Sequence, residues 1–532
     1  MKNFLSIFIG ACILLSQGLT AKPNIVFILA DDLGIMDIVA FATHFTDTPA
    51  ADLYYETPNL DKLAREGVSF SQSYANQLCS PTRAAVMTGR VASTLGFTTA
   101  TPNTKTYYNQ GRETPDGCSP HDAYDHKDAI KFPMAWLNGH SNTGLDPKLP
   151  TLPKVLKTHD SYFIGKWHLG GHGADHLQPA AHGFHEIASL DAGASAYFNW
   201  QRAWNNRKPA FVTMPGKFRA GTAGKPPHQR YLVDDLAERI SQFLKDHSKK
   251  KKTNPAAKPF FLYYCPFAVH TPFQAPETTV DYFTTKKTRG TLGHKHPTYA
   301  AMLKHLDASI GKIRQTLHET GLAEDTLIIF TSDNGGVKYT QPAATDNQPF
   351  VGGKATLYEG GIRVPTIAYW PGKTAAGKWC DQVIDCTDFL PTLAQVSGNE
   401  IPKGVDGISM LDLALKPDKT RPERTLYWHY PFNVIVKHPL RGTPLSPHSA
   451  IRVGPHKLIW DWHGKLELYH IPNDPHEKTD LSTKHPELTK KLHIQLKQWL
   501  RTNVSNCCFP RKNPDFDKSD KRLTLPFTDL SP

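Results

Sequence analysis

Four short hydrophobic runs, separated by amphipathic segments, set the pattern of this chain. They are rich in Val, Ile, Phe and Tyr, as buried strands are: "NIVFILADD" (24–32), "SYFIGKWH" (161–168), "PFFLYYCPFAVH" (259–270) and "TLIIFTSDN" (326–334). Helical periodicity lies between them, in "TPNLDKLAREG" and in "YAAMLKHLDASIGKIRQTLHETG", which we expect to end at Gly321. Strands that alternate with helices predict an α/β fold with a mainly parallel sheet sandwiched by helices.

After about residue 420 the pattern changes to short strand-like segments, "TLYWHYPF", "SAIRVGPHKLIWDW" and "LELYHI", followed by a helical segment, "HPELTKKLHIQLKQWLRT". This predicts a small C-terminal α+β subdomain at 421–510 behind a main domain at 22–420. The stretch 101–150 is rich in Pro, Asn, Asp and His and is interpreted as a long insertion. The tail, 511–532, is expected to be poorly ordered.

The first 21 residues have the pattern of a secretory signal. Lys2 precedes an apolar stretch from Phe4 to Leu15, and small or polar residues follow up to Ala21. A membrane anchor needs roughly 20 apolar residues, and this run is shorter. A lipoprotein site at Cys12 fits less well, because the apolar stretch continues past it. No later segment is apolar enough to span a membrane, so we expect a periplasmic or secreted protein.

A formal charge of +12 favours an anionic partner. The lysines do not interleave with aromatic residues as in a nucleic-acid-binding module, so no nucleic acid is expected. An anionic polysaccharide suits an exported protein better. The densest basic run, "KDHSKKKK", follows a helical pattern and is interpreted as the solvated C-terminal end of a helix, which favours positive charge.

Oxygen ligands follow two of the predicted strands: Asp31 and Asp32 after the first, Asp333 and Asn334 after the last. Carboxylate and amide oxygens suit a hard divalent cation, and no Cys/His cluster accompanies them, so Ca²⁺ or Mg²⁺ is favoured over zinc. Each pair alone can also serve as a helix cap or a turn. Because ligands bind at the carboxyl ends of strands in α/β sheets, the joint placement predicts a metal site.

Positive and titratable residues are expected at the same edge. Lys166 and His168 are two positions apart on a predicted strand, so both side chains should project from the same face. His270 ends the third predicted strand, and Lys354 lies in the glycine-rich "GGKATLYEGGIRVP". Together with Arg83 these residues describe a site for a tetrahedral oxyanion ester, where catalysis is mostly charge stabilisation and positioning.

Cys79 stands in "NQLCSPTRAAVMTGR", in a chain with few other cysteines. A disulfide, a thiol nucleophile, a metal ligand and a covalently modified residue are all conceivable. The cysteine content does not suggest a disulfide scaffold, although Cys380 with Cys386, or one of Cys507 and Cys508, could form a bridge. A thiol is a poor ligand for Ca²⁺, so we expect Cys79 to be modified.

These motifs resemble the sulfatase family. "CSPTRAAVMTGR" matches the family signature CxPxR followed by TGR, and the likeness continues through "PNIVFILADDLG", "YYETPNLDKLAREG", "GKWHLG", "HTPF", "TSDNGG", "GGKATLYEGGIRVP" and "LYHIPNDPHEKTDL". The resemblance implies the alkaline-phosphatase superfamily fold and a cysteine that a maturation enzyme oxidises to formylglycine during export. Met87, where leucine is commoner, and the insertion at 101–150 are the departures.

The resemblance also implies a mechanism. The aldehyde hydrates to a gem-diol, one hydroxyl attacks sulfur, and collapse of the diol expels sulfate. Transferred to this chain, it makes position 79 the nucleophile, held with the oxyanion by Arg83 and Lys166, and His168 the base for the collapse. His270 and Lys354 face the sulfate and the leaving oxygen. The implied metal ligands are Asp31, Asp32, formylglycine 79, Asp333 and Asn334, usually around calcium, and Asp307 is structural.

The sequence thus predicts an exported sulfuric ester hydrolase acting on a sulfated carbohydrate. His429, His448 and Arg452 are candidates for sugar contacts, although ordinary roles in folding explain them as well. Two alternatives stay open. One is a phosphoesterase or phosphonate hydrolase on the same fold, and the other is an inactive glycan-binding protein in which Cys79 remains a thiol.

Overall fold

The structure is a computed structural model of the 532-residue chain. It describes residues 22–100, 136–142, 144–170, 175–190, 230–288, 292–340, 342–432 and 447–514, with shorter pieces at 122–123, 197–198, 212–213, 290, 434–437, 439–440, 444–445 and 516. The predicted signal peptide, most of the predicted insertion and the tail from residue 517 lie outside these residues.

The main sheet of the described chain has nine strands in the order β13, β2, β12, β11, β1, β10, β7, β8, β9. The five central strands, β11 to β8, are parallel to one another, whereas β12 and β9 are antiparallel to their neighbours β11 and β8. In chain order the strands are β1 (Asn24–Ala30), β2 (Val68–Phe70), β7 (Asp160–Lys166), β8 (His185–Leu190), β9 (Val212–Thr213), β10 (Phe260–Cys265), β11 (Thr326–Ser332), β12 (Thr366–Tyr369) and β13 (Lys378–Cys380).

Strand β1 lies at the centre of the sheet and divides its side chains between two cores. Val26, Ile28 and Ala30 belong to one hydrophobic core, and Ile25, Phe27 and Leu29 belong to the other. Successive residues of a strand point to opposite faces, so a strand covered on both sides must be hydrophobic at every position. The unbroken run "NIVFILA" therefore predicts a central strand, and the structure confirms it.

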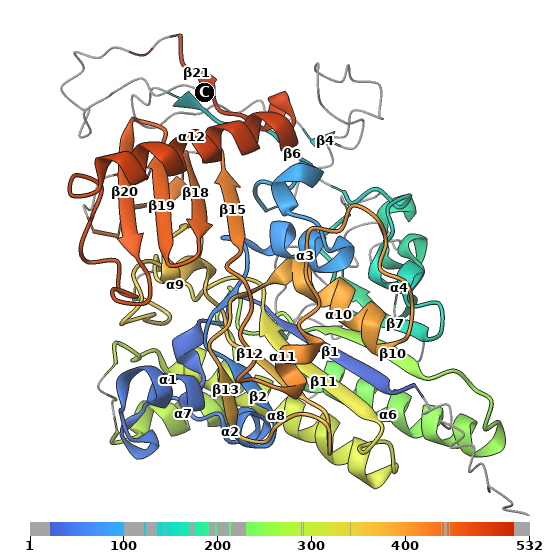
Figure 1. The fold of residues 1–532 in the computed structure, drawn as a ribbon. Coiled ribbons are helices and arrows are strands. Elements are labelled where there is room, and N and C mark those ends of the chain that lie inside the picture. The colour runs from blue at the N-terminus through green and yellow to red at the C-terminus, as the bar shows by residue number, and fades with distance from the viewer. Residues whose placement is uncertain are drawn as a thin grey trace, which may run out of the picture.

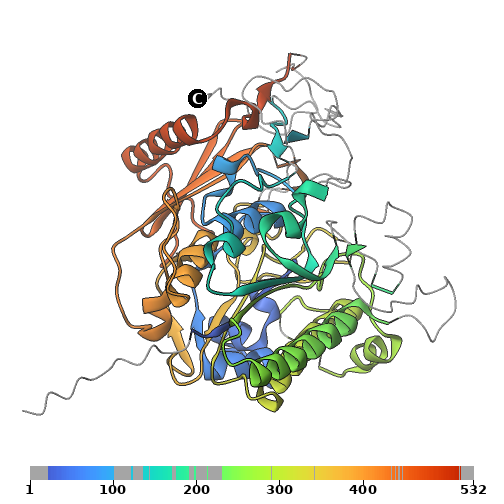
Figure 2. The ribbon, with the colours of Figure 1, turned by 90° about the vertical axis from the view of Figure 1, so that its right-hand side faces the viewer.

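Helices cover both faces of the sheet (Figures 1 and 2). One core includes residues of α1 (Val39–Thr46), α2 (Pro58–Glu66), α6 (Leu232–Thr253), α7 (Glu277–Thr285) and α8 (Pro297–Glu319). The other includes residues of α3 (Cys79–Thr88), α4 (Leu152–Val155), α10 (Phe389–Val396) and α11 (Leu411–Leu415). The predicted α/β sandwich is therefore confirmed, and α8 ends two residues before Gly321, which has a positive φ of 72°.

The C-terminal subdomain is a four-stranded antiparallel sheet in the order β15, β18, β19, β20, covered by one helix (Figure 1). Its elements are β15 (Thr425–Tyr430), β18 (His448–Val453), β19 (His456–Asp461), β20 (Lys465–His470) and α12 (Pro486–Asn503). The predicted strand and helix segments are confirmed. The exact boundaries at 420 and 510 stay predictions.

Short strands form further pairs: β3 (Ser73–Tyr74) with β14 (Ile384–Asp385), β4 (Asp122–Ala123) with β6 (Ser141–Asn142), β5 (Trp136–Leu137) with β21 (Arg511–Lys512), and β16 (Val434–Lys437) with β17 (Pro444–Leu445). The first two residues of the predicted tail thus form a strand. Cys380 and Cys386 are both buried free thiols in this structure, so the bridge considered between them is not present.

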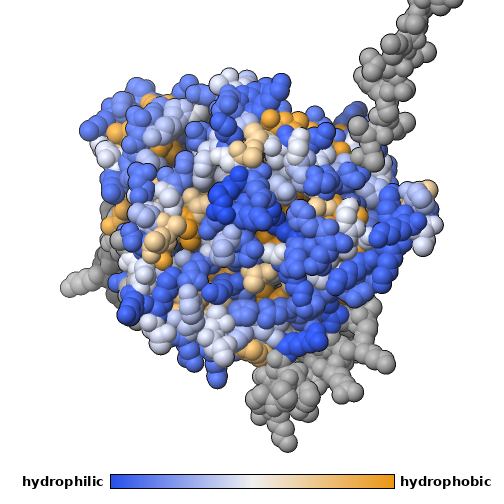
Figure 3. Space-filling view, turned by 90° about the horizontal axis from the view of Figure 1, so that it is seen from below, coloured by the Kyte–Doolittle hydropathy of each residue, from blue (hydrophilic) through white to orange (hydrophobic). Residues whose placement is uncertain are grey.

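Among the described residues, we find no helix whose length and hydropathy would let it cross a membrane. The face seen from below is largely hydrophilic, with hydrophobic residues scattered over it (Figure 3). Helix α6 continues through Lys249 to Lys252, and these four lysines are exposed. The basic run is therefore the exposed C-terminal end of a helix, as predicted.

The central strands end two to five residues earlier than the hydrophobic runs suggest, so most of the predicted site residues lie in the loops that follow. One expectation changes as a result. Strand β7 ends at Lys166, and His168 has a left-handed backbone with φ of 55°. The direction of the His168 side chain is therefore set by the loop conformation and not by alternation along a strand.

Candidate active site

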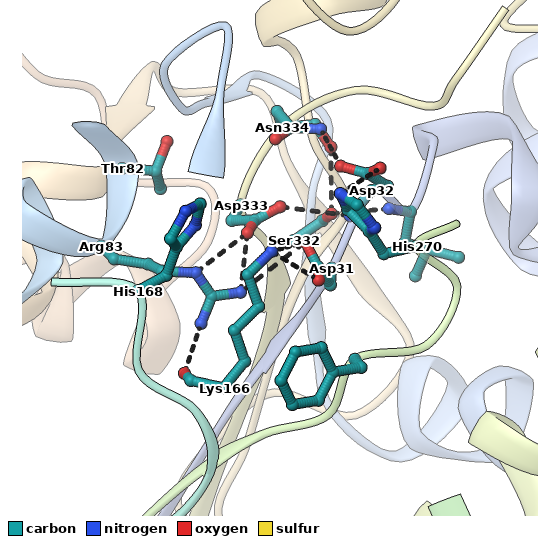
Figure 4. A network of polar contacts seen from close by, with 12 residues as sticks. Asp31, Asp32, Thr82, Arg83, Lys166, His168, His270, Ser332, Asp333 and Asn334 are labelled. Carbon is teal, nitrogen blue, oxygen red and sulfur yellow. Dashed lines mark hydrogen bonds and ion pairs between the residues drawn. The ribbon is translucent and has the colours of Figure 1, made fainter. Parts of the chain in front are cut away.

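Loops from four parallel strands meet at one edge of the main sheet (Figure 4). Asp31 and Asp32 follow β1, Asp333 and Asn334 follow β11, Lys166 ends β7, and His270 lies beyond the end of β10. The two aspartates after β1, both residues after β11 and Lys166 are fully buried. The structure therefore brings together the residues that the sequence placed at separate strand ends.

Hydrogen bonds join the segment that follows β1 to the end of β11 and the segment that follows it. The amide of Asp32 donates to Asp333 Oδ1 at 3.1 Å, and the amide of Leu33 donates to Ser332 Oγ at 3.1 Å. Asp32 has φ of 61°, a left-handed conformation that Asp and Asn tolerate better than most residues. This turn directs the carboxylate of Asp32 toward Asn334, whose Nδ2 donates to Asp32 Oδ1 at 2.9 Å.

Three buried carboxylates in the cluster each have a cationic partner. Lys166 Nζ lies 2.9 and 2.7 Å from the two oxygens of Asp31, and Lys354 Nζ lies 2.7 Å from Asp32 Oδ2. Arg83 donates from Nε and Nη2 to Asp333 Oδ2, at 3.1 and 2.7 Å. The network therefore connects the sheet edge with a helix, α3, and with the glycine-rich loop that carries Lys354.

Electrostatics distinguish the two aspartates after β1. Burial, together with the neighbouring carboxylates of Asp333 and Asp32, holds the pKa of Asp31 well above its usual value, and Lys166 opposes this effect. Burial also acts on Asp32, but Lys354, His270 and Lys166 outweigh it and lower the pKa of that carboxyl. Neighbouring carboxylates in a dry site repel one another, an arrangement that a divalent cation relieves.

The oxygen atoms of the cluster fit a hard cation. One ligand atom from each of Asp31, Asp32, Cys79 and His270 lies within 4.8 Å of the others. The side-chain oxygen of Asn334 is buried and has no hydrogen-bond partner in the described part of the chain. An unbonded buried acceptor is costly, and here it borders a group of carboxylates. Oxygen atoms of this kind are the ligands that Ca²⁺ and Mg²⁺ prefer.

Cys79 is the first residue of α3 and is buried. Burial raises the pKa of its thiol to about 11, although Lys166 and Lys354 act in the opposite direction. An unmodified thiol would therefore be protonated at neutral pH and a weak nucleophile. The helix is held in place by Arg83 Nη1, which donates to Lys166 O at 2.9 Å, and by Ser80 Oγ, which donates to His168 O at 2.9 Å.

The ring of His270 is oriented by its own neighbour. Nδ1 lies 2.7 Å from the carbonyl oxygen of Thr271, which can only accept, so Nδ1 carries the proton. Nε2 lies 3.6 Å from Asp32 Oδ2, inside the cluster. Burial and the nearby Lys354 lower the pKa of His270 to about 3, so the ring is neutral in the protein without substrate.

The loop carrying Lys354 contacts both sides of the site. The amide of Lys354 donates to Gly336 O at 3.1 Å, just beyond Asn334, and the amide of Ala355 donates to Gln77 O at 2.9 Å, just before Cys79. The side chain of Lys354 is 6% exposed. This loop therefore sets the distance between the segment that follows β11 and the start of α3.

The three candidates for sugar contacts lie outside this cluster and are buried. The ring nitrogens of His429 contact Ser449 Oγ at 2.8 Å and Cys508 O at 3.1 Å. Arg452 donates to the hydroxyl of Tyr74 and to Gln72 Oε1, and the ring of His448 packs 5.5 Å from that of Tyr430. Their role as substrate contacts stays a prediction.

Asp307, expected to be structural, accepts hydrogen bonds from the amides of Asn59 and Leu60 and joins α8 to the start of α2. Sequence reasoning did not single out Glu359, Lys457 or Glu477. These three residues are fully buried and form ion pairs beside the Lys354 loop. The available signal was an acidic residue inside a glycine-rich loop, which is an unusual position for a charge without a partner.

Comparison with known proteins finds sulfatases among both family models and individual sequences. A model of the sulfatase family matches residues 23–399, and a model described as the C-terminal part of N-sulphoglucosamine sulphohydrolase matches residues 352–503. A sulfatase of Formosa agariphila is 28% identical over 519 residues, covering 91% of this chain and 89% of its own. The N-acetylgalactosamine-6-sulfatase of Rattus norvegicus is 29% identical over 471 residues, covering 86% of this chain and 75% of its own.

Among solved structures, Ps i-CgsB in complex with k-i-k-neocarrahexaose aligns with a TM-score of 0.69 and 25% identity, covering 92% of this chain and 94% of that one. The protein yidJ of Bacteroides fragilis aligns with a TM-score of 0.63 and 21% identity, covering 93% of this chain and 99% of that one. The second likeness supports the fold alone.

Proposed function

Because this chain belongs to the sulfatase family and is a sulfuric ester hydrolase, we propose that it removes sulfate from a sulfated carbohydrate, using formylglycine at position 79 and a bound divalent cation. The observation that carries the proposal is the placement of Cys79. Cys79 is the first residue of a buried helix, and its Sγ lies within 4.8 Å of ligand atoms from two aspartates and a histidine. Two lysines and an arginine form ion pairs with the carboxylates around it.

The substrate class is inferred from the relatives and from charge. The names of the similar proteins include an N-acetylgalactosamine-6-sulfatase, and Ps i-CgsB was solved in complex with k-i-k-neocarrahexaose. The formal charge of +12 favours an anionic polymer. A sulfated polysaccharide or oligosaccharide is therefore the proposed substrate.

The proposed nucleophile differs from the encoded side chain. The thiol of Cys79 is buried and its pKa is raised to about 11 by burial, so it would be a poor nucleophile at neutral pH. Formylglycine, once formed by a maturation enzyme, supplies a hydrated aldehyde whose oxygen can attack sulfur. The sequence "CSPTR" at 79–83 matches the family signature for this modification.

The cation would be held by the carboxylates of Asp31, Asp32 and Asp333, the side-chain oxygen of Asn334 and the modified side chain at position 79. Ca²⁺ is favoured and Mg²⁺ is the alternative. The unpartnered Asn334 oxygen and the surrounding carboxylates fit such an ion. When bound, the cation supplies positive charge to the reacting oxygens.

The remaining residues act on charge and protons. Lys354 and Lys166 present ammonium groups to the sulfate oxygens, where charge develops in the transition state. Arg83 holds α3, and with it position 79, against Asp333. His270 directs Nε2 into the site and would deliver a proton to the leaving oxygen, which it must take up after the substrate binds. His168 would act as the base in the second half of the reaction.

Residues 1–21 are proposed to be a signal peptide that directs the protein to the periplasm or outside the cell. The maturation enzyme is then a required partner, and the C-terminal subdomain closes one side of the substrate site.

Two measurements test the function. Mass spectrometry of the peptide spanning Cys79 should show a loss of about 18 Da when the protein is produced with a maturation enzyme. The same preparation should hydrolyse sulfated oligosaccharides much faster than the matching phosphate esters, and Cys79→Ala should hydrolyse neither. An intact thiol in fully active protein, or a preference for phosphate, contradicts the proposal.

A further inference from the structure

A second group of buried charges lies between the main domain and the C-terminal subdomain. Glu359, Lys457 and Glu477 are each completely inaccessible to solvent. Glu359 is the first residue of α9 (Glu359–Ile362) in the main domain, Lys457 lies on β19, and Glu477 follows β20. These three residues, which we term the interdomain triad, belong to none of the roles assigned above.

The triad is closely bonded. Lys457 Nζ donates to Glu359 Oε1 at 2.9 Å and forms an ion pair with Glu477 Oε1, also at 2.9 Å. The amide of Glu359 donates to Glu477 Oε2 at 2.7 Å. The second oxygen of Glu359 accepts from the Tyr74 hydroxyl at 2.7 Å and from Arg363 at 3.3 Å. A shift of Lys457 would therefore move both the side chain and, through Glu477, the backbone of Glu359.

Burial of this many charges is weak evidence for a stabilising role. Buried ion pairs can often be replaced by hydrophobic residues of similar size without loss, because desolvation offsets the attraction. Their best-attested use is to fix one arrangement of the chain. Here the arrangement that is fixed is that of α9 relative to β19.

The backbone transmits this arrangement to Lys354, which lies five residues before Glu359. Between them the chain folds back on itself. The amide of Gly360 donates to Val351 O at 2.7 Å, and that of Gly335 donates to Gly361 O at 2.9 Å. A Cβ added at Gly361 would lie 2.5 Å from Gly353 O. The loop is so tightly packed that a displacement of α9 must displace Lys354.

Lys354 itself has little freedom to compensate. Its own amide and that of Ala355 are bonded to Gly336 O and Gln77 O, and its ammonium lies 2.7 Å from Asp32 Oδ2. A small movement of the loop would therefore change the position of this charge relative to Cys79 and to the cation ligands. Misplacement by about 1 Å can cost on the order of 10²-fold in rate.

We propose that the interdomain triad positions Lys354 for its contact with sulfate, which makes Lys457 and Glu477 of the C-terminal subdomain positioning residues of the active site. This inference rests on the role of Lys354 in the proposed function. It assigns the subdomain a task beyond closing the substrate site, because the position of the sulfate-binding charge is then determined from β19 and the segment after β20.

The test is a double-mutant cycle between Lys457→Met and Lys354→Ala. Methionine keeps the length and the apolar stem of lysine and removes the charge. In the wild-type background, Lys457→Met should lower kcat/KM for an aryl sulfate by about 10- to 100-fold and weaken binding of inorganic sulfate, measured by calorimetry. In the Lys354→Ala background the same substitution should have almost no further effect, because there is no ammonium left to position.

A matched control separates positioning from general damage. Arg424 forms a mostly buried ion pair with Asp388, also at the border of the two domains. Within the described residues, it has no hydrogen bond or ion pair with the triad or with the Lys354 loop. Arg424→Met should lower the melting temperature while leaving kcat/KM and sulfate affinity near wild type. Glu477→Gln provides a second variant that keeps the shape of the side chain if Lys457→Met does not fold.

Three outcomes overturn the proposal. Wild-type kcat/KM and sulfate affinity in folded Lys457→Met and Glu477→Gln would show that the triad does not position Lys354. A loss that multiplies with that of Lys354→Ala would show that it acts elsewhere, leaving the proposed function intact. Full activity of Lys354→Ala on its own would overturn the role of Lys354, and this proposal with it.

Discussion

The guanidinium group of Arg83 places two of its nitrogens on a single oxygen of Asp333, at 3.1 and 2.7 Å, across 250 positions of the chain. Both side chains are almost completely buried, with 1% and 0% exposed. This contact attaches the helix that begins at Cys79 to the end of β11. The distance between the proposed nucleophile and the proposed cation therefore depends on it.

Arg83→Met should destabilise the protein strongly, because it leaves the buried carboxylate of Asp333 without its cation. Breaking a buried pair in this way costs about 3 to 5 kcal/mol. Urea unfolding of the metal-free protein measures the change. Lys62→Met, which removes an exposed pair with Glu66, should change the free energy of unfolding by no more than about 1 kcal/mol. Similar values for the two variants would mean that Asp333 finds another partner.

Removal of divalent cations by a chelator should abolish turnover, and Ca²⁺ or Mg²⁺ should restore it. Asp333→Ala should not be restored at ordinary metal concentrations, because the loss of a carboxylate removes both charge and geometry. Asn334→Ala should need a higher metal concentration, since it removes a neutral oxygen only. Calcium titration of activity measures all three proteins. Full activity of Asp333→Ala would mean that these residues only form turns and do not bind a cation.

His270→Ala should impair hydrolysis of a carbohydrate sulfate far more than hydrolysis of 4-nitrophenyl sulfate. A sugar alkoxide needs a proton to leave, whereas a nitrophenolate does not, and a positioned acid contributes about 10² to 10⁴ in rate. Lys354→Ala should impair both substrates alike, since it acts on the sulfate charge common to them. The kcat/KM values of both variants on both esters decide the matter. An equal loss in His270→Ala would leave this histidine as a sulfate-binding residue only.

Acidification should lower the free energy of unfolding of the wild-type protein more than that of the His493→Phe variant. Burial lowers the pKa of His493 to about 4, and its ring packs against Trp460 at 4.8 Å. Because the pKa is lower in the folded state than in the unfolded state, the neutral ring contributes to the free energy of unfolding. This contribution is complete above the unfolded pKa near 6.5 and is lost as the pH falls toward 4, by at most about 3 kcal/mol.

Phenylalanine keeps the aromatic contact without titrating. The free energy of unfolding, measured by urea at intervals between pH 7 and pH 4, should therefore fall less steeply in His493→Phe. Parallel curves for the two proteins would mean that His493 keeps an ordinary pKa in the folded state.

The sequence predicts the centre of this structure well for a simple reason. Strands β1, β10 and β11 are buried at every position and β7 at five of its seven, so each contains a hydrophobic run. Their carboxyl ends share one edge because the strands are parallel. Residues that follow such runs must come together. Asp31 and Asn334 could be placed from periodicity alone, before any resemblance was considered.

Contacts between the two domains could not be predicted in this way. Lys457 and Glu359 are separated by 98 positions, and on a half-buried strand a lysine usually faces solvent. Arg452 stands between Ile451 and Val453, an alternation typical of a strand with one face in solvent, yet its guanidinium lies over the Tyr74 ring at 5.0 Å. The direction of His168 depends on one left-handed dihedral angle, which no periodicity indicates.

All ten residues of α3 are buried, and this has a consequence for production of the protein. In the proposed function, a modifying enzyme could not reach Cys79 once the helix has docked, so oxidation would compete with folding in each newly made chain. A chain that folded first would keep its thiol and, on the proposed mechanism, would stay inactive. Specific activity would then vary between preparations with the rate of synthesis, even when every molecule is folded and pure.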